Sequence, residues 1–90
     1  MNPIVVKFGG SSLATAAQFE KVAAIIREAP ARRYVVASAP GKRFDGDTKV
    51  TDLLYRCYDA ACAGQEFAPV LDEIRQRFAD IIGALRLSAN

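Results

Sequence analysis

The fold is decided near the start of the chain, where residues 3–12 read PIVVKFGGSS. Residues 3–8 are apolar and rich in β-branched side chains, which predicts a short buried strand of the parallel type. The strand stops at Gly9 and Gly10, and the two serines that follow complete a tight polar turn. A helix and a second strand should follow this turn.

The helix has clear start and stop residues. Thr15 and Gln18 fit a capping box, and Pro30 ends the helix at about Ala29. Between these ends, apolar residues recur on one helix face: Phe19, Val22, Ala23 and Ile26. Residues 34–38, YVVAS, are a second short apolar run. Strand, helix and strand within about 35 residues predict a βαβ unit with two parallel strands.

The second half of the chain predicts two helices. Residues 40–47, PGKRFDGD, form a polar, turn-rich loop. Helix resumes near residues 48–51, and Gly64 is well suited to the position after its end. A short link at residues 64–66 leads into the last helix, so the two helices should form an antiparallel hairpin.

The last helix has the clearest period. Its apolar residues hold one face for about five turns: Phe67, Val70, Leu71, Ile74, Phe78, Ile81, Ile82 and Leu85. Asp72 with Arg75 and Glu73 with Arg77 are expected on the opposite, solvated side. The predicted fold class is therefore α/β, a βαβ unit followed by an antiparallel helical hairpin. Two strands are few for a parallel sheet, so either the helices cover each other or the chain begins a larger fold.

Composition excludes several classes of function. The 90 residues make one domain or part of one, and a net charge of +2 argues against a nucleic-acid binder. No apolar run approaches the ~20 residues of a membrane span, and no signal peptide is recognised, so a cytoplasmic protein is expected. Histidine is absent, which excludes His-based acid–base catalysis and His-rich metal sites. Cys57 and Cys62 fall on different faces of one helix, so no disulfide is expected between them.

The turn at the end of the first strand suits a phosphate. Lys7 lies at the carboxyl end of the strand, where ligands bind in open α/β sheets. Gly9 and Gly10 let backbone N–H groups approach a ligand, and Ser11 adds a hydroxyl at a helix start, which favours anions. A plain glycine turn beside a solvated lysine explains the same residues about equally well.

Other phosphate and metal motifs do not fit. Gly41-Lys42 is followed by Arg43 rather than by serine or threonine, and no glycine lies at the required upstream position, so there is no Walker A loop. Residues 45–47, DGD, lack the later ligands of a calcium loop and are better explained as a turn in a mobile loop.

Two hydroxyls mark a second candidate site. Ser38 ends the second strand, so it should share one rim with the Lys7 turn. Thr51 begins the next helix, where a hydroxyl can bind a carboxylate. Alternatively, Ser38 is only a strand-end hydroxyl and Thr51 only a cap. The basic loop residues Lys42, Arg43 and Lys49 could attract an anion or could simply be solvated.

Three stretches together resemble one family. IVVKFGGSSLA at residues 4–14, VVASAPGK at 35–42 and KVTDLL at 49–54 are similar to the N-terminal part of aspartokinase, within the amino-acid kinase superfamily. The resemblance implies an ATP-dependent kinase acting on the side-chain carboxylate of L-aspartate, in the biosynthesis of lysine, threonine and methionine. It covers most of residues 3–60, and the fold it implies is the first part of an amino-acid kinase fold.

The resemblance also implies a role for each matching residue. Lys7 would neutralise the transferred phosphoryl group, and Gly9, Gly10 and Ser11 would bind the ATP phosphates. Ser38 and Thr51 would hold the aspartate. Mg²⁺ would accompany the ATP, and no residue of the chain is assigned to a metal.

The same resemblance implies that residues 1–90 are an N-terminal fragment without an ACT domain, inactive alone. The alternatives are a helical module that works by oligomerising, without catalysis, or a fragment of another amino-acid kinase. Two unpaired sheet edges and the long apolar stripe predict a homo-oligomer. No nucleic-acid or membrane partner is expected.

Overall fold

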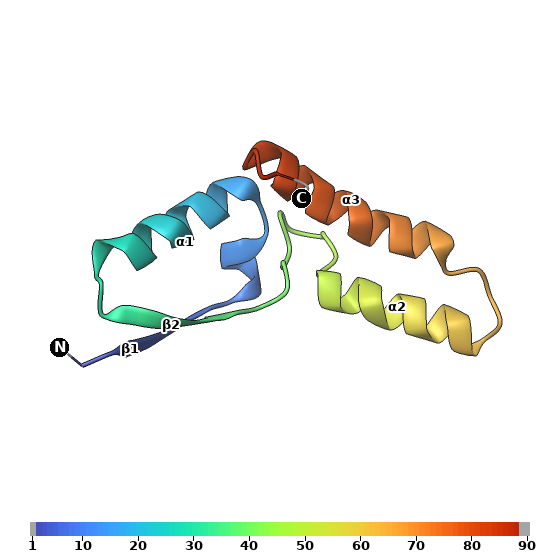
Figure 1. Ribbon diagram of the computed structural model, residues 1–90. Coiled ribbons are helices and arrows are strands. Elements are labelled where there is room, and N and C mark those ends of the chain that lie inside the picture. Colours follow the sequence, from blue (N-terminus) through green and yellow to red (C-terminus); the bar gives the residue numbers. More distant parts are fainter. Residues whose placement is uncertain (1, 89–90) are drawn as a thin grey trace.

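The computed structural model describes residues 2–88 and has an α/β fold (Figure 1). Its elements follow in this order: strand β1 (Ile4–Phe8), 3₁₀ helix η1 (Gly10–Leu13), helix α1 (Ala16–Glu28), strand β2 (Arg32–Ala37), helix α2 (Val50–Cys62) and helix α3 (Ala68–Ala84). The predicted βαβ unit and the helical hairpin after it are both confirmed. β2 begins two residues earlier than expected and ends just before Ser38.

β1 and β2 pair in parallel, with Lys7 opposite Val36 and Phe8 opposite Ala37. α1 connects the two strands and packs against β2. The expectation of a buried strand is wrong for the described residues, because Val5 is 67% and Val36 is 50% exposed. A two-stranded sheet has two faces and two edges, and one short helix covers only part of that surface.

Local capping explains where α1 begins. The backbone N–H of Gln18 donates to the Thr15 hydroxyl oxygen at 3.3 Å, as the capping box requires. The second half of the box is absent, because the Gln18 amide donates instead to the carbonyl of Ser11 at 3.4 Å. This contact ties the first turn of α1 back to η1.

α2 and α3 lie side by side as a hairpin (Figure 1). Gly64 has a φ of +69°, the left-handed conformation predicted for the residue that ends α2. The core of the hairpin consists of Val50 and Leu53 from α2 and Ile74 from α3. The half-buried Cys57 packs against this core, and both cysteines are free, as expected.

The inner face of α3 differs from the predicted apolar stripe. Ile74 and Ile81 are buried, but Phe78 and Ile82 are about 40% exposed, and Arg77 is buried with 4% exposure. The prediction that Arg77 lies on the solvated side is therefore wrong. The physical reason is that Arg77 follows Ile74 by three residues and precedes Ile81 by four, so it shares their face.

The described chain is elongated. Its radius of gyration is 15.7 Å and its extents are 54 × 30 × 26 Å, whereas a compact domain of this length has a radius of gyration of about 12 Å. The βαβ unit and the outer end of the hairpin extend away from each other (Figure 1). This shape leaves much of the apolar surface uncovered. Among residues 2–88, no helix has the length and hydropathy needed to cross a membrane.

Candidate functional site

The site forms where the two parallel strands end. The backbone N–H of Ser38 donates to the Phe8 carbonyl at 3.2 Å, which extends the strand pairing to the last residues of both strands. The segment after β2 then crosses the glycine turn, where the N–H of Gly41 donates to the carbonyl of Gly10 at 2.8 Å. Two segments that are about thirty residues apart in sequence are thus joined through backbone atoms.

This crossing requires glycine at position 41 and leaves little room for a side chain at position 10. A Cβ added at Gly41 would lie 2.6 Å from the carbonyl carbon of Gly10 and 2.8 Å from the backbone nitrogen of Ser11. A Cβ at Gly10 would lie 3.1 Å from the Cα of Gly41. Because the obstructing atoms belong to the backbone, no side-chain rotation could relieve these contacts.

A cavity of about 450 Å³ opens beside the crossing, between the glycine turn, the segment after β2 and the start of α2. Four of the predicted site residues line it: Gly10, Ser11, Ser38 and Thr51. The tertiary structure therefore brings together the phosphate-type turn and the two hydroxyl residues. Their parts in ligand binding stay predictions.

Two further predicted site residues, Lys7 and Gly9, are not among the residues that line the cavity. Lys7 is exposed on β1, where its register partner is Val36. Gly9 is also exposed and has extended backbone angles, φ −76° and ψ 173°, immediately before η1.

The charges around the cavity have both signs. Lys42 and Lys49 line it, and so does Asp52 in the first turn of α2. The N-terminus of this thirteen-residue helix carries a partial positive charge, and its N-cap Lys49 makes no side-chain capping bond. The arrangement can bind an anion and still offers one carboxylate to a cationic group.

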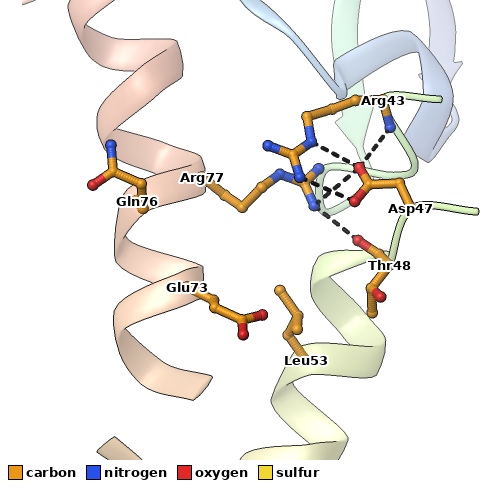
Figure 2. Close-up of a pocket in the computed structure, with 7 residues that line it drawn as sticks. All are labelled: Arg43, Asp47, Thr48, Leu53, Glu73, Gln76 and Arg77. Carbon is orange, nitrogen blue, oxygen red and sulfur yellow. Dashed lines mark hydrogen bonds and ion pairs between the residues drawn. The ribbon is translucent and has the colours of Figure 1, made fainter. Parts of the chain in front are cut away.

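Sequence analysis did not predict an ionic cluster of Arg43, Asp47 and Arg77, in which the Arg77 and Asp47 side chains are largely buried and Arg43 is partly exposed. Asp47 accepts hydrogen bonds from Arg43, whose Nε lies 2.7 Å and whose Nη2 lies 3.0 Å from its two oxygens. The Nη1 of Arg77 lies 3.8 Å from the same carboxylate (Figure 2). Asp47, the last residue of the DGD segment, is thus held by these contacts, whereas the expected mobility of the loop stays a prediction.

The cluster shifts the pKa of each member. Hydrogen bonding from Arg43 holds the pKa of Asp47 far below its ordinary value, and the same bond raises the pKa of Arg43. Burial lowers the pKa of Arg77, and the positive charge of Arg43 lowers it further. The i+4 spacing of Arg43 and Asp47 was the sequence feature that could have indicated their pairing.

No metal cluster is found within residues 2–88, where no three or more Cys, Asp or Glu side chains gather so that they could hold an ion. Among the described residues that line the cavity, Asp52 is the one carboxylate.

The comparison with known families agrees with this geometry, two parallel strands with a glycine turn and a cavity at the strand ends. The chain belongs to the amino acid kinase family, whose model matches residues 2–86. More particularly, it is 48% identical over 83 residues to aspartokinase 3 of Bacillus subtilis, a match that covers 92% of this chain and 18% of that protein. The resemblance to aspartokinase seen in the sequence is confirmed.

A solved structure gives the same result for the fold. The chain superposes on aspartate kinase of Clostridium acetobutylicum with a TM-score of 0.95 and 43% sequence identity. The superposition covers all of this chain and 21% of that one. The chain thus spans about a fifth of the length of the relatives it matches, and it has the fold of the corresponding part of an amino-acid kinase.

Proposed function

We propose that this chain provides the phosphate-binding turn and part of the aspartate-binding wall of an ATP-dependent aspartate kinase. The observation that carries the proposal is the cavity at the strand ends, which is lined by Gly10, Ser11, Ser38 and Thr51. These residues come from three separate segments, and all belong to the stretches that resemble aspartokinase. The names of the two relatives supply the substrate, aspartate.

The phosphate side uses the turn after β1. Gly9, Gly10 and Ser11 precede or open η1, where the first backbone N–H groups have no acceptor within the helix. Such groups can donate to the phosphates of ATP, and Gly10 has no side chain to obstruct them. Lys7 brings a positive charge to the same end of β1, where it would neutralise the transferred phosphoryl group.

The aspartate side uses the two hydroxyls. Ser38 lies directly after β2, and Thr51 lies in the first turn of α2. A hydroxyl and a helix N-terminus both favour a carboxylate. Lys42 and Lys49 in the cavity wall add to the attraction for anionic substrates.

In the reaction, an oxygen of the aspartate side-chain carboxylate attacks the γ-phosphorus of ATP. The bond from that phosphorus to the β,γ-bridging oxygen breaks, which leaves aspartyl phosphate and ADP. Catalysis of such a transfer consists mainly of positioning and charge stabilisation, for which a lysine and oriented amides are suited. Mg²⁺ bound with ATP would neutralise further phosphate charge. None of residues 2–88 is assigned to hold this ion.

The proposal is tested with Lys7→Ala in the complete protein that carries this sequence, assayed by aspartate-dependent release of ADP. Removing a charge that acts in the transition state lowers kcat by about 10²–10³-fold. Lys21→Ala is the matched control, because Lys21 is an exposed lysine on α1, away from the cavity. If Lys7→Ala keeps kcat within a few-fold of the control, the role proposed for Lys7 is wrong.

We further propose a cytoplasmic homo-oligomer. The support for assembly is the exposed apolar surface of both strands and of α3, which includes Val5, Val36 and Phe78. An uncovered strand edge is a ready surface for pairing with a second chain.

A further inference from the structure

Arg77 makes unusual contacts for a helical arginine. Its side chain is 5% exposed, and its guanidinium donates to two backbone carbonyls. Nη1 donates to the carbonyl of Thr48 at 2.8 Å, and Nη2 donates to the carbonyl of Gly41 at 2.5 Å. These acceptors lie 29 and 36 residues earlier in the sequence, so a single side chain of α3 contacts a distant loop twice.

The two carbonyls mark the ends of one loop, residues 41–48. A guanidinium is planar and rigid, so binding both carbonyls fixes the distance between the loop ends. The interior of the loop is held by Arg43 and Asp47, and Asp47 also lies within 3.8 Å of the Arg77 guanidinium. Figure 2 shows this arrangement, with the side chain of Arg77 reaching from α3 to the loop.

Both loop ends continue directly into the cavity wall. Gly41 lines the cavity and donates its N–H to the Gly10 carbonyl at 2.8 Å. Thr48 precedes Thr51 by three residues, and the N–H of Val50 between them donates to the Pro40 carbonyl at 3.0 Å. A movement of either loop end would therefore displace residues that line the cavity.

Burying the charged guanidinium of Arg77 disfavours folding unless its hydrogen bonds offset the loss of hydration. The Nε of Arg77 is buried with no hydrogen-bond partner among the described residues. A buried polar atom without a partner disfavours folding, and lysine could supply a charge but not two fixed donors. The two loop carbonyls are therefore bound by the planar guanidinium of arginine, which a lysine could not replace.

We propose that Arg77 is a positioning residue that sets the affinity of the cavity for aspartate by holding both ends of loop 41–48. The inference rests on the proposed function and adds a residue outside the three motifs, residues 4–14, 35–42 and 49–54. Arg77 itself does not line the cavity. It acts through Gly41 and Thr48 on the segments that carry Ser38 and Thr51.

The test uses Arg77→Lys in the complete protein, with Arg75→Lys as the matched control. Arg75 lies on the same helix, has a side chain that is 73% exposed and, among the described residues, makes only a 3.8 Å ion pair with Asp72. Two measurements are made on each variant. The first is the KM for aspartate, the KM for ATP and kcat, and the second is hydrogen–deuterium exchange of the amides in residues 41–48.

The expected result is a rise of about tenfold in the KM for aspartate, the loss that follows when one charged hydrogen bond is removed. The KM for ATP and kcat stay within a few-fold, because the glycine turn is also held by β1. Amides of residues 41–48 exchange faster. Arg77→Ala shows a larger rise, which millimolar methylguanidinium partly reverses. Arg75→Lys changes none of these quantities.

Several results would overturn the inference. Unchanged amide exchange in both Arg77 variants means that Arg77 does not hold the loop. Faster exchange with an unchanged KM for aspartate means that the loop does not set affinity. A fall in kcat alone, in proportion to the folded fraction and without methylguanidinium rescue, means that Arg77 is only structural. If the wild type releases no ADP in response to aspartate, both the proposed function and the inferred effect on aspartate affinity are wrong. The exchange data then still report whether Arg77 holds the loop.

Discussion

Gly41→Ala is the sharpest test of the backbone crossing at the cavity. Gly41 does not have a positive φ, so alanine fits its backbone conformation and only the added Cβ matters. That atom would lie 2.6, 2.8 and 2.9 Å from three backbone atoms of Gly10 and Ser11. Contacts this short require the crossing segments to separate.

The magnitude follows from what separation disrupts. Inserting a carbon into a filled space costs about 1–3 kcal/mol. Separation also weakens the bond from Gly41 N–H to the Gly10 carbonyl and the charged bond from Arg77 to the Gly41 carbonyl, worth about 1 and about 1.5–3 kcal/mol. Because the chain relieves the overlap partly at the expense of these bonds, we expect a total loss of about 2–4 kcal/mol in the free energy of unfolding.

The assay is thermal unfolding followed by far-UV circular dichroism. For a chain of this size each kcal/mol shifts Tm by about 4–8 °C, so a loss of 2 kcal/mol lowers Tm by roughly 8–16 °C. Gly83→Ala is the matched control. A Cβ at Gly83 meets nothing within 4 Å, and alanine in a helix stabilises by about 0.5–1 kcal/mol relative to glycine. The reasoning is refuted if Gly41→Ala and Gly83→Ala shift Tm in the same direction.

Three further predictions concern the site, the ionic cluster and assembly. In the complete protein, Ser38→Ala and Thr51→Ala raise the KM for aspartate more than they lower kcat, and steady-state kinetics with an unchanged KM would contradict their role. Because the folded state holds the pKa of Asp47 low, its contribution to stability is present above the unfolded pKa of about 4 and is lost as the pH falls below it. Urea unfolding across this range should show that Asp47→Asn has a flatter acid limb than the wild type. Analytical ultracentrifugation of the 90-residue chain at micromolar concentration should show a dimer that Phe78→Glu or Ile82→Glu weakens, whereas a 9.7 kDa monomer would contradict assembly.

Much of the fold was predictable because its signals are local. The hydroxyl of Thr15, the left-handed Gly64 and the apolar runs of the strands each act within a few residues of the chain. They fixed the order of elements, the parallel pairing and the hairpin. The resemblance of three short stretches then indicated the candidate site, and the fold brought Gly10, Ser38 and Thr51 to one cavity.

Burial was less predictable than order. The apolar strands read as buried, yet Val5 and Val36 are exposed in the described chain, because burial depends on what packs against a face. An apolar sequence states only that burial would be favourable. In α3 the opposite occurred, because Arg77 is buried on the inner face although a charged residue was expected to face solvent.

The sequence by itself determined the secondary structure, the parallel pairing and the residues that can meet at the strand ends. Only the tertiary structure decided that Gly41 crosses Gly10 at contact distance, and that Arg77 is buried against a loop 36 residues away. The physical reason is that helix and strand periods report which side of an element a residue faces. The partner on that side is set by how separate elements pack, and no local pattern records it.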